Sequence, residues 1–358
     1  MNAVMTTGRR LGGRAVFPLV LLTTLLFAGA SQAQAESELL RKPVGKGAYE
    51  MAYSQSANAL YLATSQSRKL DKGGVVYRLD PTTLDVTQII HNDIKPFGAA
   101  INNKTNTLFF GNTVNSSVTA IDAATGEVKG RLVLDARKRA EGVKPLAPRE
   151  LVADESSDTV YITGLGESSV VWVVDGKDLT LRATIKGTGK FGTGLALDAA
   201  AKRLYVTNSE GELVTIDTAA NKVLTRKKLD AANEHFFLNI SLDTANHRAF
   251  ITDSKQPQVL VVDTRNGEIL HKIDAPESLA VLFNPARNEV YVTHRKAGAV
   301  SVIDANTYQV RETLKTPTHP NSLALSPDGK TLYVSVKQAS SRDKEATAPD
   351  DVIRVSLK

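Results

Sequence analysis

The chain has 358 residues, with 44 lysines and arginines, 38 aspartates and glutamates, no cysteine and a formal net charge of +6. The absence of cysteine excludes disulfides, thiolate metal sites and thiol catalysis. A charge so close to balance does not by itself indicate a polyanion-binding protein, so the positions of the cations carry more information than their total.

The first 35 residues are predicted to be a cleaved secretory signal peptide. Three arginines within residues 9–14 precede the mainly apolar run 15–30, and the small residues Ala33 and Ala35 offer a cleavage site before Glu36. The run is shorter than the ~20 apolar residues that a membrane-spanning helix needs. We therefore expect an exported, periplasmic protein without membrane insertion, and loss of the three arginines lowers the net charge to +3.

Residues 36–358 are predicted to form a single domain of seven repeated modules. A short segment with the pattern hydrophobic, aromatic, hydrophobic, small recurs every 41 to 52 residues. Its aromatic residues are Tyr61, Phe109, Tyr161, Tyr205, Phe250, Tyr291 and Tyr333. Each copy is typical of four antiparallel strands, a to d, with the aromatic residue in strand b and an aspartate closing strand c in six copies. This period predicts an all-β, seven-bladed β-propeller with four-stranded antiparallel blades.

The seventh module has an incomplete set of strands. Residues 352–357 are its predicted strand c, and no strand d follows. Residues 39–44, upstream of the first strand a, form a spare strand-like segment. Because an unpaired strand edge favours aggregation, we expect this N-terminal segment to complete the last blade and close the ring.

Several motifs resemble one family of propellers. The Tyr-Val-Thr-Asn segment Tyr205–Asn208 is the hallmark of YVTN repeats, and longer segments at 45–54, 277–288 and 317–322 are similar to the YncE-type periplasmic seven-bladed propellers of enteric bacteria. The resemblance extends over residues 39–357. It implies a protein that binds DNA, chiefly single-stranded, with no cofactor and no established enzymatic activity.

The b–c and d–a loops are long and lie on one face of the predicted propeller. We expect functional residues there, because loops on a rigid scaffold commonly carry function. Cations that follow phosphates and aromatic rings that stack on bases are the features of single-strand binding sites. The predicted DNA-binding residues are Arg68, Lys69, Lys72, Phe97, Arg149, Lys190, Phe191, Arg295 and Lys296. The alternative is that the two phenylalanines pack between blades and the cations are ordinary solvated surface.

Three histidines are weak candidates for metal ligands. His235, His294 and His319 belong to the loop face of the fifth, sixth and seventh modules, where imidazoles near the pore could bind Zn²⁺ or Cu²⁺. They are far apart in sequence, and no closely spaced pair of ligands occurs. We therefore assign no metal.

An enzymatic function is not expected. The sequence predicts a ring of carboxylates and amides at the pore, as in propeller lactonases, but no combination of nucleophile and base. These pore residues are Glu50, Glu150, Asn239, Glu277 and Asn321. The sequence therefore favours a monomeric DNA-binding protein. A scaffold for another envelope protein or a glycan, a general polyanion binder, and a metal-binding, ligand-binding or lactonase-like pore stay open as alternatives.

Overall fold

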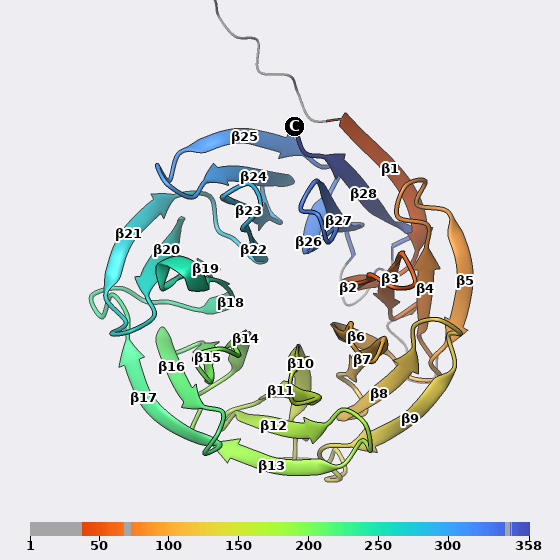
Figure 1. The fold of residues 1–358 in the computed structure, drawn as a ribbon, viewed down its shortest axis with the longest axis horizontal. Helices are drawn as coiled ribbons and strands as arrows, with labels where there is room; N and C mark the ends of the chain where they lie inside the picture. Colours follow the sequence, from red (N-terminus) through yellow and green to blue (C-terminus); the bar gives the residue numbers. More distant parts are fainter. Residues whose placement is uncertain (1–37, 68–72, 341–343, 345) are drawn as a thin grey trace, which may run out of the picture. The chain divides into compact units, whose positions relative to one another are not determined.

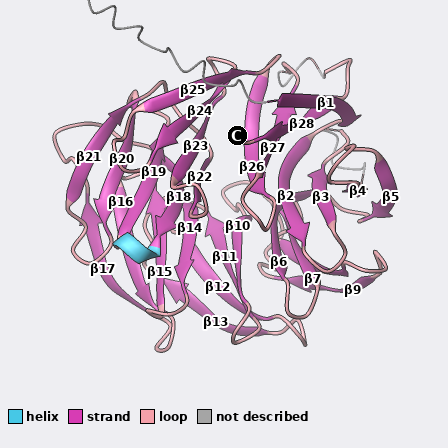
Figure 2. Cartoon of the chain, turned by 45° about the horizontal axis from the view of Figure 1, so that its top comes forward, coloured by secondary structure: helices cyan, strands magenta, loops and turns pink. Residues whose placement is uncertain are grey.

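Seven four-stranded antiparallel sheets stand in a ring (Figure 1), which confirms the predicted all-β, seven-bladed propeller. The computed structural model describes residues 38–67, 73–340, 344 and 346–358. Within those ranges the only helix is the short 3₁₀ turn η1, Thr244–Asn246 (Figure 2), and no helix there is long and apolar enough to cross a membrane. The predicted signal peptide and the candidates Arg68, Lys69 and Lys72 lie outside the described residues.

Each blade runs from an inner strand a to an outer strand d. Blades 1 and 2 are β2 (Ala48–Ser54), β3 (Ala59–Thr64), β4 (Val75–Leu79), β5 (Val86–His91), and β6 (Pro96–Asn102), β7 (Thr107–Asn112), β8 (Ser117–Asp122), β9 (Val128–Val133). Blades 3 and 4 are β10 (Ala147–Asp154), β11 (Thr159–Leu165), β12 (Val170–Asp175), β13 (Leu181–Lys186), and β14 (Gly192–Asp198), β15 (Arg203–Asn208), β16 (Glu212–Asp217), β17 (Lys222–Lys228). Blades 5 and 6 are β18 (Phe237–Asp243), β19 (Arg248–Asp253), β20 (Gln258–Asp263), β21 (Ile269–Asp274), and β22 (Val281–Asn284), β23 (Glu289–His294), β24 (Ala299–Asp304), β25 (Val310–Lys315). Blade 7 is β26 (His319–Leu325), β27 (Thr331–Lys337), β28 (Asp350–Ser356) and β1 (Glu38–Gly45).

The hydrophobic core is divided among the junctions between neighbouring blades. Seven clusters of buried residues occur in the described chain, and each joins side chains from two adjacent blades. All seven predicted aromatic residues of strand b are at most 4 % exposed. Strands b and c are almost wholly buried, whereas strands a such as β2 are partly buried. The reason is that one side of strand a faces the central channel.

The ring closes as predicted, by pairing of strands from opposite ends of the chain. In Figure 1, β1 runs beside β28, and their register extends from Glu38 opposite Ser356 to Gly45 opposite Asp350. Arg41 also forms an ion pair of 3.0 Å with Asp351. Blade 7 therefore consists of three C-terminal strands and one N-terminal strand.

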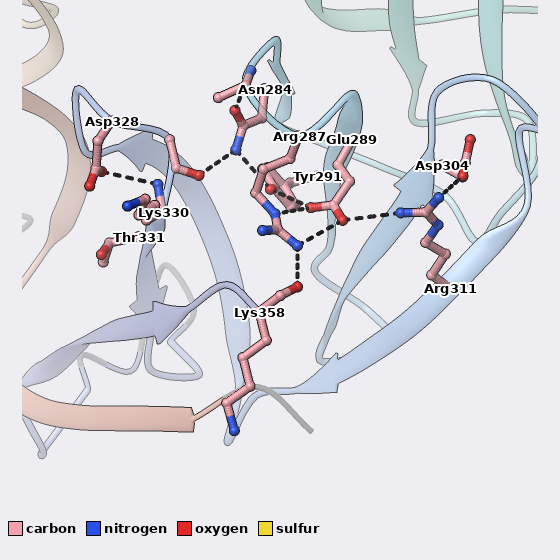
Figure 3. A network of polar contacts seen from close by, with 12 residues as sticks. Asn284, Arg287, Glu289, Tyr291, Asp304, Arg311, Asp328, Lys330, Thr331 and Lys358 are labelled. Atoms are coloured by element: carbon pink, nitrogen blue, oxygen red, sulfur yellow. Dashed lines mark hydrogen bonds and ion pairs between the residues drawn. The ribbon is translucent and has the colours of Figure 1, made fainter. Parts of the chain in front are cut away.

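A polar network ties the end of blade 7 to blade 6 (Figure 3). Arg287 contacts Glu289 at 2.8 Å and donates to the main-chain carbonyl of Lys358. Asn284 donates to the carbonyl of Gly329, in the a–b turn of blade 7, at 2.7 Å. These contacts lie near the closure and support the junction of the last two blades.

The aspartate that ends strand c organises the turn that follows. Its carboxylate accepts hydrogen bonds from main-chain N–H groups two or three residues later, for example from Ala124 and Thr125 to Asp122 at 2.8 and 2.9 Å. These donors lower the pKa of the Asp122 carboxyl. The fifth residue of the turn has a positive φ, whether it is Gly126 or Leu84. The recurrent aspartate is thus explained by turn geometry.

Candidate nucleic-acid interface

A register shift near the start of strand a places side chains at the channel mouth. In six blades strand a has an irregular register there, as between Ala48 and Met51 in β2 and between Pro148 and Leu151 in β10. Such a bulge changes the direction in which side chains point and is common next to functional sites. In this chain the shifted segments carry Tyr49, Phe97 and Arg149, which all line the cavity at the mouth.

The threonine of the repeat motif stabilises this bulge. Its hydroxyl accepts a hydrogen bond from an N–H of the shifted segment, which has no partner in the regular ladder. The pairs in the shifted strands are Glu150 to Thr163 (3.0 Å), Gly194 to Thr207 (3.2 Å), Asn239 to Thr252 (2.9 Å) and, with serine in place of threonine, Ser322 to Ser335 (3.1 Å). In blade 6, whose strands a and b pair without a register shift, the Ala280 N–H donates to Thr293 in the same way at 2.9 Å. The hydroxyl in this repeat position therefore helps to position the pore-facing residues.

The channel mouth contains a cavity of about 480 Å³. Its lining residues come from six of the seven blades and include both aromatic and charged side chains. Among them are Tyr49, Phe97, Arg149, Arg295, His319 and Lys337. Three residues proposed from sequence, Phe97, Arg149 and Arg295, are thus brought together.

Two adjacent aromatic rings, with a cation on either side, lie along one wall of the cavity. The ring centroids of Tyr49 and Phe97 lie 4.1 Å apart. The Lys337 Nζ atom lies 3.9 Å from the Tyr49 ring centroid, and the Arg149 Cζ atom lies 5.9 Å from that of Phe97. We call Lys337, Tyr49, Phe97 and Arg149 the mouth series. It runs across blades 7, 1, 2 and 3, and both phenyl-type rings are half-buried.

Arg295 is a further cation of the cavity. Although this residue keeps access to solvent, the protein around its guanidinium lowers its pKa by desolvation. Within the described residues it forms no ion pair, and His319 Nδ1 lies 2.9 Å from its main-chain oxygen. An arginine still carries its charge at neutral pH. The cavity therefore contains a positive charge that no described carboxylate neutralises directly.

An acidic pair forms the floor of the cavity. Glu50, Glu150 and Asn239 line both this cavity and a narrower space of about 150 Å³ deeper in the channel. Burial and the charge of Glu150 raise the pKa of Glu50 well above its usual range. Glu50 accepts a hydrogen bond from the Ala99 N–H at 2.9 Å, and a proton on its carboxyl relieves the repulsion from Glu150.

Two neighbours stabilise the charge of Glu150. Arg149 Nη1 lies 3.3 Å from Glu150 Oε1, and the Asn239 amide, with its nitrogen turned toward Glu150, donates at 3.0 Å. Of the other pore residues proposed from sequence, Asn321 lines the cavity, whereas Glu277 pairs with Lys296.

The remaining candidates lie away from the mouth cavity. Phe191 is half-buried and faces the Phe236 ring at 6.5 Å, with Lys190 Nζ 5.4 Å from its centroid. Lys190 forms an ion pair of 2.8 Å with Glu167. The side chain of Lys296 is 82 % exposed and paired with Glu277. Both lysines thus form exposed ion pairs and do not line the cavity.

The three histidines do not form a common site. His235 is buried with Nδ1 2.5 Å from Asp253 Oδ2 and Nε2 3.1 Å from the Asp230 carbonyl. His294 is buried between the Pro276 carbonyl and Ser301 Oγ, at 3.0 and 2.9 Å, and burial lowers its pKa. His319 lines the mouth cavity. Each imidazole therefore has its own hydrogen-bond partners, and the three do not share a site.

Tyr49 and Lys337 were absent from the residues proposed as DNA contacts. The signal for Tyr49 was its position near the start of strand a, which matches that of Phe97 in the next module. Lys337 donates to the Ala48 carbonyl at 3.0 Å, across 289 positions of sequence. Their proximity depends on closure of the ring, which brings blades 7 and 1 together.

Comparisons with known proteins agree with this architecture. The protein YncE of Escherichia coli strain K12 is 72 % identical over 339 residues, which cover 94 % of this chain and 96 % of that protein. YncE of Salmonella typhimurium strain LT2 is 70 % identical with the same coverage. A family model described as outer membrane protein assembly factor BamB matches residues 114–326. Hydrazine synthase of Kuenenia stuttgartiensis shares the fold with a TM-score of 0.68 at 15 % identity, over 82 % of this chain and 93 % of that chain.

Proposed function

The chain belongs to the YncE family of seven-bladed propellers, and from this premise we propose that it is a periplasmic, non-enzymatic protein that binds DNA, preferentially single-stranded, on its loop face. The observation that carries the proposal is the mouth series, in which the adjacent rings of Tyr49 and Phe97 are flanked by the cations Lys337 and Arg149. Base stacking on aromatic rings together with cations for the backbone is how single strands are bound without strict sequence preference.

Further cations lie on one loop of the same face. The segment between β9 and β10, which leads into Arg149, is a d–a loop, like the segment before Phe97. It carries the exposed residues Arg137, Lys138, Arg139 and Lys144. Only Arg137 among these forms an ion pair with a described residue, Asp135, at 2.6 Å. The phosphates of a single-stranded DNA bound at the mouth could contact the cations of this loop.

The recessed position of the aromatic rings favours a single strand over a duplex. Tyr49 and Phe97 are half-buried at the cavity wall and do not project from the surface. Bases of a duplex are stacked and paired, so reaching these rings costs the energy of unstacking. Bases of a single strand are available at a smaller cost.

A salt series on the mature protein tests this function. Single-stranded DNA, duplex DNA and heparin are titrated separately at several salt concentrations. We expect the single strand to bind most tightly, with log K falling linearly with log salt because cations are released from contacted phosphates. Equal affinity for heparin and single-stranded DNA would show general polyanion adhesion, and no binding to any of the three would refute the proposal.

A scaffold that docks another envelope protein is the second candidate. It is supported by the match of residues 114–326 to the model of an outer membrane assembly factor. The same titration separates DNA binding from protein docking, because a docking scaffold is not expected to prefer single-stranded DNA over heparin. A monomer is expected in either case, and sedimentation of the mature protein measures this directly.

A further inference from the structure

The mouth cavity has the size and closure of a small-molecule site. Its volume of about 480 Å³ lies within the range of roughly 300–1,000 Å³ that is typical of ligand pockets. Below it the channel narrows to a space of about 150 Å³, and Glu50, Glu150, Asn239 and Ser322 line both spaces. These four residues form a polar partition, so a ligand at the mouth meets a floor.

The upper part of the cavity suits a phosphate group. Arg149, Arg295 and Lys337 all line it. Arg149 shares its charge with Glu150 at 3.3 Å, and Lys337 lies 3.6 Å from Asp350, whereas Arg295 has no described ion-pair partner. Three cations line one cavity, and Arg295 interacts with Asp350 only at a distance beyond that of an ion pair, so the cavity favours an anionic ligand.

The floor excludes a second negative charge. Burial and, after it, the charge of Glu150 raise the pKa of Glu50. A phosphate at this depth would meet the charge of Glu150, but a neutral polar ring would meet hydrogen-bonding carboxyl and amide groups. The charges therefore orient a ligand with its anionic group toward Arg295 and its uncharged polar edge toward Glu150 and Asn239.

The aromatic wall of the same cavity provides apolar contact for a flat ring. Tyr49 and Phe97 pack on each other at 4.1 Å, and both line the cavity. The planar guanidinium of Arg149 lies beside Phe97 and offers a second flat surface. An anionic group, a flat ring and an uncharged polar edge are the three parts of one nucleotide, and this one cavity has residues that suit each of them.

We propose that the mouth cavity is a pocket for a single nucleotide unit, and that a free nucleoside monophosphate occupies it in the same way as one nucleotide of a bound strand. This inference rests on the proposed binding of single-stranded DNA. It adds that one nucleotide is taken into the cavity with its base on the wall of Tyr49 and Phe97 and its phosphate beside Arg295.

Competition between deoxythymidine monophosphate and a fluorescent oligodeoxythymidine tests the pocket. We expect the monophosphate to bind with one-to-one stoichiometry by calorimetry and to displace the oligonucleotide. Thymidine, which lacks the phosphate, and inorganic phosphate, which lacks the ring, should each bind about tenfold more weakly or worse.

Two variants locate the site. Arg295→Gln and Phe97→Leu should each weaken monophosphate binding by about tenfold or more. Arg265→Gln makes the same charge change in a c–d turn on the opposite face and should leave that binding unchanged. Thermal melting of each variant shows whether the fold is retained.

The outcomes separate the pocket from the proposed function. Failure of the monophosphate to compete, while the oligonucleotide still binds, would overturn the pocket and leave the proposed function intact. Displacement by inorganic phosphate as effective as that by the monophosphate would also overturn it. Absence of binding by both the oligonucleotide and the monophosphate would refute the pocket and the function together.

Discussion

Phe97 and Phe237 illustrate two roles of phenylalanine near the start of strand a. Phe97 is half-buried at the cavity wall, whereas Phe237 is 0 % exposed in the cluster between blades 4 and 5. Phe97→Ala should lower single-strand affinity by roughly 1–3 kcal/mol, measured by fluorescence anisotropy. Phe237→Ala should instead lower the free energy of unfolding by about 3–5 kcal/mol. A large loss of stability in Phe97→Ala with unchanged binding would make Phe97 an ordinary packing residue.

Glu50 is expected to make stability depend on pH. Its raised pKa means that the folded state holds the proton to a higher pH than the unfolded chain, whose carboxyl titrates near 4.5. The contribution of Glu50 to stability is therefore fully present below that value and is lost as pH rises through the folded pKa. Glu50→Gln keeps an acceptor for the Ala99 N–H and cannot ionise, so its melting temperature should exceed that of the natural protein at neutral pH.

The difference in melting temperature between Glu50→Gln and the natural protein should disappear in acid, where Glu50 is protonated in both the folded and the unfolded state. Glu127→Gln, at an exposed position, is the matched control and should change the melting temperature little at any pH. A melting temperature for Glu50→Gln below that of the natural protein at neutral pH would show that the carboxylate of Glu50 is needed in its charged form.

Individual site residues were predictable where one module carried the signal. Phe97 and Arg149 follow from the sequence because each lies near the start of a recognisable strand a, just after a d–a loop. The contact of Lys337 with Tyr49 was not predictable, because these residues belong to blades 7 and 1 and meet only in the closed ring. The histidines show the converse, since adjacent modules did not bring their rings together.

At the scale of the strand, the bulge and its threonine act as a unit. Thr163 is 0 % exposed, and its hydroxyl accepts from the Glu150 N–H at 3.0 Å. Thr163→Val removes this acceptor and leaves a buried N–H without its partner, which should cost about 1–3 kcal/mol of unfolding free energy. Denaturant unfolding measures this, and Thr163→Ser, which retains the hydroxyl, should lose less. Equal stability of the two variants would show that the bulge does not need the hydrogen bond.

The elements themselves were largely predictable, because the same pattern recurs in every module. Strand b is fixed by its buried aromatic residue, and the c–d turn by an aspartate such as Asp122. The bulges were not predictable, since an extra residue in strand a changes the register without changing its composition. The sequence therefore predicts where the pore-facing residues are in the chain better than where their side chains point.

At the scale of the whole molecule, stability depends on contacts between neighbouring blades. Each cluster of the core joins two blades, so every blade needs both neighbours to bury its faces. The cluster between blades 7 and 1 contains Tyr333 and Leu60, with Leu40 and Val44 of β1 packed against it. Closure of the ring is thus part of the same packing that stabilises every other junction.

Deleting residues 36–44 should open the last blade. The change removes most of β1, exposes the edge of β28 and strips Leu40 and Val44 from the cluster between blades 7 and 1. From the apolar area lost, the melting temperature should fall by roughly 10 °C or more in calorimetry.

Because a truncated protein sometimes fails to fold, the double change Leu40→Cys with Arg354→Cys provides a second test, since these residues are directly opposite in the β1–β28 pair. Strand partners lie within disulfide reach, and the chain has no other cysteine to compete. The oxidised form should melt at a higher temperature than the reduced form, because the crosslink prevents the ends from separating. An unchanged melting temperature in both experiments would show that the closure does not limit the stability of the propeller.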